Sequence, residues 1–103
     1  MMAMLHTVNK SPFERNALES CLRLAKSGSS VLLTEDGVVG AMKGTAHSKS
    51  IEGAMGNISF YVLGPDLKAR GLSESNVVDG VKVVDYSGFV DLAADHESVQ
   101  AWL

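Results

Sequence analysis

Cys21 is the residue whose type most directly suggests chemistry, because it is the only cysteine among 103 residues. A thiol acts as a nucleophile or as a sulfur carrier only where it is accessible and its thiolate is stabilised. Cys21 falls near the centre of the apolar half of a predicted helix, between Leu18 and Leu22. This placement favours a buried, inert cysteine, and the alternative is a thiol beneath a loop that opens.

Four acidic residues lie where predicted strands end or predicted helices begin, namely Glu35, Asp36, Asp66 and Asp85. If they gathered at one edge of a sheet they could hold Mg²⁺, because hard cations prefer oxygen ligands. Acidic residues in such places more often cap helices and interact favourably with helix dipoles. We expect the capping role here.

Three histidines, His6, His47 and His96, could join Cys21 as zinc ligands by residue type. None is spaced as the ligand pairs of zinc sites usually are, so we expect no metal site. His6 lies inside a predicted strand and is expected to be a core histidine. The loop of residues 9–12 after that strand contains no glycine, which argues against a phosphate-binding loop. We therefore expect no cofactor.

The helix that carries Cys21 is the middle of a predicted strand–helix–strand unit. Ser11 and Glu14 match a capping box, Pro12 suits the first helical position, and Gly28 is expected to close the helix. Apolar runs predict strands at residues 4–8, 31–33, 58–63 and 81–84. Further short helices are expected at residues 38–43, 51–55, 66–70 and 88–95. This alternation predicts an α/β fold with a mostly parallel sheet of four to five strands and helices on both faces.

The bulk properties exclude several classes of function. With 46% hydrophobic and 20% charged residues, the chain is typical of one globular domain over residues 1–103. A net charge of −3 argues against direct binding of nucleic acid. A single cysteine fits a reducing compartment, and no apolar stretch approaches the roughly twenty residues that span a bilayer. We expect a cytoplasmic protein that does not bind membranes.

Five stretches occur along the chain in the order LHTVNKSPFERNALESCLRLA, LLTEDGV, YVLGPDLKARG, VDYSGFVDL and QAWL. Together they resemble the DsrH/TusB family of sulfur-relay subunits over nearly the whole chain. The first and third stretches are more similar to the DsrH of sulfur-oxidising bacteria than to the TusB of tRNA thiolation. The resemblance implies a small DsrE-like domain.

The same resemblance implies partners. It points to a cytoplasmic heterohexamer with two copies each of DsrE-like, DsrF-like and DsrH-like subunits, which correspond to TusD, TusC and TusB. Sulfur would travel as a persulfide, chiefly on a cysteine of the DsrE-like subunit, to DsrC in sulfur oxidation. In the Tus relay it would pass to TusE and on to wobble 2-thiouridine in tRNA. No cysteine occurs at residues 35–37 or 64–69, so the carrier cysteine of the DsrE-like subunit has no counterpart here.

We therefore expect a non-catalytic subunit that completes an assembly and shapes its docking surface. One alternative is a sulfurtransferase with Cys21 as its own persulfide carrier, since DsrH-type chains carry a cysteine at this place. Others are a TusB-type subunit and an orphan regulatory domain without a relay role.

Several apolar residues exceed what one small core obviously needs, and surplus apolar surface usually marks an interface. The candidates for the docking surface are Val38, Val39, Met42 and Trp102, with Met55 beside them. The alternative is that they simply complete the core. Through the same surface the isolated chain could self-associate. The roles of His6, Lys10 and Asp36 at the strand edge stay open.

Overall fold

The computed structural model describes residues 4–13 and 16–102, and its centre is one sheet of five parallel strands. The strands are β1 (Met4–Val8), β2 (Ser30–Leu33), β3 (Ser59–Leu63), β4 (Lys82–Val84) and β5 (Ser98–Trp102). Their order across the sheet is β4-β3-β2-β1-β5, and every neighbouring pair is parallel. The predicted α/β fold with a mostly parallel sheet is confirmed.

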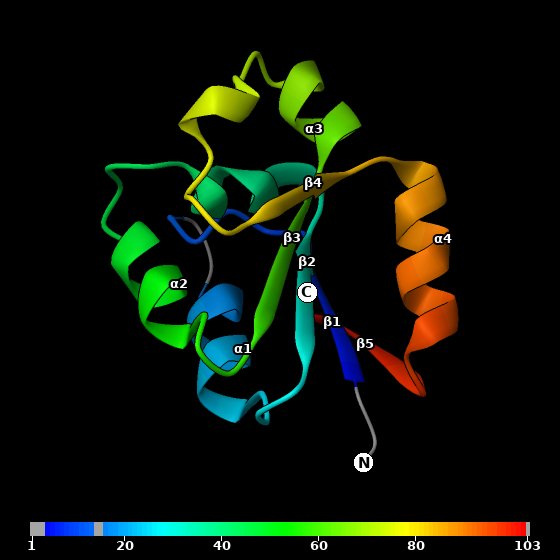
Figure 1. Cartoon of the computed structure of the whole chain (residues 1–103). Helices are drawn as coiled ribbons and strands as arrows, with labels where there is room; N and C mark the ends of the chain where they lie inside the picture. The colour runs from blue at the N-terminus through cyan, green and yellow to red at the C-terminus, as the bar shows by residue number, and fades with distance from the viewer. Residues whose placement is uncertain (1–3, 14–15, 103) are drawn as a thin grey trace.

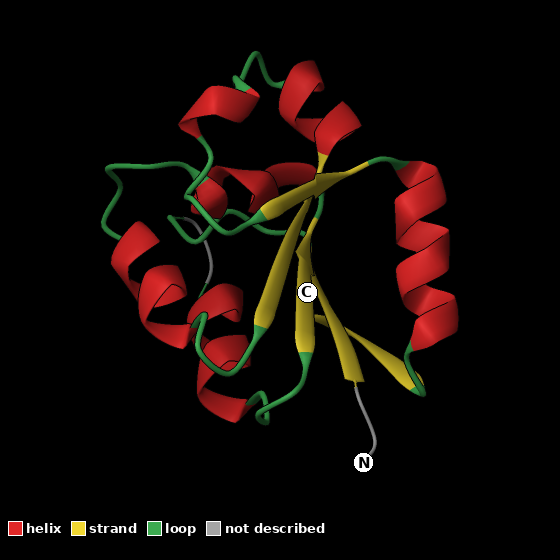
Figure 2. Ribbon diagram, in the orientation of Figure 1, coloured by secondary structure: helices red, strands yellow, loops and turns green. Residues whose placement is uncertain are grey.

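Helices cover both faces of the sheet (Figures 1 and 2). On one face lie α1 (Ala17–Leu24) and α2 (Ser48–Ala54), and on the other lies α4 (Tyr86–Asp95). Above the carboxyl ends of the strands sit the 3₁₀ helix η1 (Glu35–Ala41), α3 (Gly64–Ala69) and the short η2 (Glu74–Asn76). No helix within these described segments is long and apolar enough to cross a membrane.

The core lies between the sheet and the two helices α1 and α2. Alternate strand residues such as Val31 and Phe60 point to this side and pack with Leu18, Cys21 and Ile51. All four residues of β2 are buried, which is the pattern of a central parallel strand covered on both faces. The continuous apolar run therefore correctly predicted the middle of the sheet.

The start of α1 differs from the prediction. The capping box placed the first turn directly after Ser11, but α1 begins only at Ala17 and ends at Leu24, before Gly28. The hydroxyl of Ser11 instead accepts a hydrogen bond from the Phe13 N–H at 3.2 Å, which stabilises a local turn. Glu14, the other half of the proposed box, lies outside the described residues.

The C-terminal strand was missed. β5 pairs with β1 in register from Met4 opposite Ser98 to Val8 opposite Trp102. Its sequence, SVQAW, mixes polar and apolar residues because it forms an edge of the sheet, where both faces are only partly covered. Edge strands of this kind give a weak sequence signal, and pairing with a buried neighbour stabilises them.

Candidate functional site

Cys21 lies in the core, as its position on the predicted apolar half indicated. Its side chain is fully buried, and the thiol is free. Burial raises the pKa of the Cys21 thiol from 9.0 to about 12, because the charged thiolate would lose its hydration. In this conformation the sulfur is neither accessible nor ionised at neutral pH, which are the two properties that a sulfur carrier needs.

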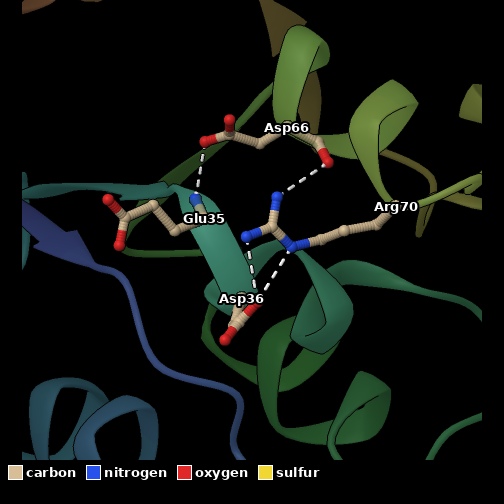
Figure 3. Close-up of polar contacts among 4 residues, drawn as sticks. All are labelled: Glu35, Asp36, Asp66 and Arg70. Carbon is tan, nitrogen blue, oxygen red and sulfur yellow. Dashed lines mark hydrogen bonds and ion pairs between the residues drawn. The ribbon is translucent and has the colours of Figure 1, made fainter.

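The polar rim at the carboxyl ends of the strands is a connected cluster of four residues (Figure 3). The backbone N–H of Glu35 donates to Oδ2 of Asp66 at 2.6 Å. Both Nε and Nη2 of Arg70 donate to Oδ1 of Asp36 at 2.9 Å, and Nη1 donates to the Asp66 carbonyl oxygen at 3.3 Å. The guanidinium therefore joins η1 to α3.

Three of the four acidic residues, Asp36, Asp66 and Asp85, accept hydrogen bonds within the fold. The described residues contain no group of three or more histidine, cysteine, aspartate or glutamate side chains placed to hold a metal ion. Asp85 is an N-cap, since its carboxylate accepts the Gly88 N–H at 2.8 Å at the start of α4. Asp36 was expected to cap the following helix, but Thr34 occupies that position and Asp36 instead pairs with Arg70.

The beginning of η1 is held tightly against β1. Glu35 adopts φ +49°, a left-handed conformation that is uncommon for a residue with a side chain. Its bond to Asp66 stabilises that conformation. Two residues on, Gly37 passes so close to Val8 that any Cβ would collide with the Val8 carbonyl oxygen. The rim is thus closely packed against β1.

The three histidines lie in separate parts of the fold. His6 is buried, and its Nδ1 accepts a hydrogen bond from Nε1 of Trp102 at 3.0 Å. His96 follows α4 and contacts the hydroxyl of Ser30 through Nε2 at 2.9 Å. His47 packs edge-on against Phe13, with ring centroids 4.9 Å apart.

The predicted docking residues do not form one exposed surface. Val38 and Met42 are buried in the chain's own core, so for them the alternative of completing the core describes the structure. Val39 is half-buried, and Trp102 is half-buried against the edge of the core. Both Val38 and Met42 follow β2 closely, and η1 folds them back over the sheet rather than outward.

A different element, α4, presents apolar side chains to the outside. Tyr86 and Val90 are 60% and 66% exposed, and they lie four residues apart on one side of the helix. No residue of α4 is fully buried, although the helix is mostly apolar. Sequence reasoning assigned the helix but overlooked this surface. The available signal was an apolar side wider than one sheet face needs, which runs from Phe89 and Leu92 round to Tyr86 and Val90, with Ser87, Asp91 and Asp95 on the polar side.

Comparison with known proteins agrees with this architecture. Residues 10–99 match the family model described as "DsrH like protein". Proteins named TusB from Shigella flexneri and Escherichia coli K12 are 37% identical over 99 residues, which cover 96% of this chain and the whole of each relative. A TusB from Erwinia tasmaniensis is 41% identical over the same span.

Two solved structures share the fold at low sequence identity. The ychN protein of Escherichia coli superposes with a TM-score of 0.82 at 16% identity, over 98% of this chain and 99% of that protein. A protein of unknown function from Methanobacterium thermoautotrophicum gives 0.77 at 16% identity, over 97% of this chain and 99% of its own. At this identity the likeness establishes the fold and nothing further.

Proposed function

The chain belongs to the DsrH/TusB family, and from this membership we propose that it is a non-catalytic docking subunit of a sulfur relay. Its partners would be DsrE-like and DsrF-like subunits, the counterparts of TusD and TusC, in a cytoplasmic heterohexamer. Residues 1–103 would act there as one domain. The persulfide chemistry would belong to a partner, because the only thiol of this chain is buried.

The exposed apolar side chains of α4 are the observation that carries this proposal. In the isolated chain Phe89, Leu92 and Ala93 of α4 are partly buried, whereas Tyr86 and Val90 are 60% and 66% exposed, so part of the helix's apolar side is left uncovered. Covering a side chain such as Val90 at an interface would contribute up to about 1.5 kcal/mol. An additional subunit packed over Tyr86 and Val90 would complete the layer that α4 begins.

There are two candidate acceptors of the sulfur, and each corresponds to a different end use. A DsrC-like acceptor is supported by the closer resemblance of HTVNKSPFERN and YVLGPDLKARG to the DsrH of sulfur oxidisers. A TusE-like acceptor, which leads to tRNA thiolation, is supported by the name TusB that the relatives carry. Transfer of ³⁵S from a loaded complex to each purified acceptor would distinguish the two.

Co-expression with the DsrE-like and DsrF-like subunits of the same genome tests the docking role. We expect Val90→Glu to prevent co-purification while leaving the melting temperature of the isolated chain unchanged, because Val90 makes few internal contacts. Leu24→Glu is the matched control, since Leu24 is 64% exposed but lies on α1, on the opposite side of the sheet. Normal assembly of Val90→Glu, or loss of assembly with the control alone, would contradict docking through α4.

A further inference from the structure

A pocket of about 370 Å³ lies between the end of α1 and the edge strand β5. Its walls include Met4, His6, Leu24, Ser29 and Trp102, with Lys26 at its margin. A volume of several hundred cubic ångströms is within the range of small-molecule sites. The pocket combines apolar walls with a few polar groups, which is the usual composition of such a site.

His6 presents a hydrogen-bond donor to this pocket. Only 4% of the residue is exposed, and its Nδ1 accepts the bond from the Trp102 indole. An indole N–H can only donate, so Nδ1 carries no proton and the ring proton sits on Nε2. Burial also lowers the pKa of His6, which keeps the ring neutral. Among residues 4–13 and 16–102, Nε2 has no hydrogen-bond partner.

Ser29 provides a second polar group at the pocket. The residue is 5% exposed, and its backbone is fully engaged: its N–H donates to Lys26, and its carbonyl oxygen accepts from Ser59. Within the described part of the chain the Ser29 hydroxyl has no bond of its own, although it lines the pocket. Neither Nε2 of His6 nor the Ser29 hydroxyl is completely shielded from solvent, since Asn9 Oδ1 is the only fully buried side-chain nitrogen or oxygen without a partner among the described residues. Both donors are therefore open to an acceptor that enters the pocket.

The charge of the pocket restricts what that acceptor can be. Lys26 is the one cation among the residues that line it, and no ion pair engages Lys26 within the described segments. The C-terminal end of α1, with its partial negative charge, lies beside it. One ammonium group and two neutral donors suit a single negative charge, whereas a phosphate dianion would be under-compensated.

We propose that this pocket binds a small organic monocarboxylate whose body is apolar or aromatic. Its carboxylate accepts hydrogen bonds from Nε2 of His6 and the hydroxyl of Ser29, close to the ammonium group of Lys26. Its body lies against the Trp102 indole and the side chains of Met4 and Leu24. This site is separate from the docking role, which concerns α4 on the other face of the sheet.

The indole at the pocket provides the measurement, because Trp102 is the only tryptophan of the chain. Benzoate and phenylacetate are titrated into the full chain while tryptophan fluorescence and the indole N–H resonance are followed. We expect saturable changes with both acids and much weaker changes with benzamide, which has the same ring without the charge. Inorganic phosphate should not compete.

Variants test the donors. Ser29→Ala should weaken the binding of benzoate by about tenfold, since it removes a hydrogen bond to a charged group. Lys26→Gln should weaken it by up to about fivefold, as expected for an exposed ammonium. Lys49→Gln removes an exposed lysine of α2 and should change nothing. The proposal is overturned if neither acid gives a saturable change at tens of millimolar, if benzamide or phosphate binds equally well, or if the three variants bind alike.

Discussion

The burial of Cys21 predicts a rate of alkylation that can be worked out in advance. At pH 8 an ordinary thiol with a pKa of 9.0 is ionised to about one part in ten. A thiol with a pKa of about 12 is ionised to about one part in ten thousand. Because only the thiolate reacts with iodoacetamide, the folded chain should label about a thousandfold more slowly than an exposed cysteine. Complete burial of the sulfur slows the reaction further.

Intact-mass spectrometry over a time course measures this rate directly. The matched control carries Ser87→Cys together with Cys21→Ala, which places the single thiol on an exposed position of α4. In denaturant, where neither thiol is shielded, the two chains should label at similar rates. The structural account of Cys21 would be refuted if, in the native state, the control thiol at position 87 labelled much less than a thousandfold faster than Cys21.

Intact-mass spectrometry also tests whether Cys21 carries sulfur. In a carrier, the Cys21 thiolate attacks the outer sulfur of a donor persulfide, so that a cysteine persulfide forms and the donor leaves as a thiol. The chain would then gain the mass of one sulfur atom, and Cys21→Ser would not. We expect no gain by the isolated chain, because the step requires the same thiolate that burial suppresses. A mass gain of one sulfur atom that is absent from Cys21→Ser would show that the protein is itself a sulfurtransferase.

Two further predictions concern the framework. Gly37→Ala should lower the free energy of unfolding by about 3 kcal/mol or more, because the new Cβ would meet the Val8 carbonyl oxygen. Gly53 lies in α2 with open space around it, so Gly53→Ala should raise the free energy of unfolding by about 0.5–1 kcal/mol. Chemical denaturation measures both changes. His6 has a pKa below 6.5 in the folded state, so its contribution to stability is present above that pH and is lost as the pH falls through the folded value. The unfolding free energy of the wild type, followed by Trp102 fluorescence, should therefore drop below pH 6.5 more steeply than that of His6→Gln; equal slopes would contradict this assignment.

Local patterns were sufficient to predict most of the framework. Continuous or β-branched apolar runs marked β1, β2, β3 and β4 to within a residue or so, since these strands lie in or beside the buried part of the sheet. The apolar half of α1 correctly placed Cys21 in the core. These features depend on periodicity within a few residues, which a sequence displays directly.

Features that depend on distant partners could not be predicted. Asp36 and Arg70 are 34 positions apart, and nothing near either residue indicates their ion pair. The bond between His6 and Trp102 joins positions 96 apart, and it exists only because β5 pairs with β1. Val38 and Met42 were wrongly assigned to a surface. Their burial depends on how η1 turns back over the sheet, and the local sequence does not display that turn.

The shortness of α1 leads to a last prediction about the assembled complex. A helix of eight residues has little stability of its own, so the packing of Ala17, Leu18 and Cys21 against the sheet holds it in place. A partner that exposed Cys21 would have to replace these contacts, and the thiol would then react faster in the complex than in the isolated chain. If Cys21 is structural, assembly with the DsrE-like and DsrF-like subunits should leave its alkylation equally slow or slower. Faster alkylation in the complex, with the Ser87→Cys control unaffected, would show that assembly opens α1 and would assign a carrier role to Cys21.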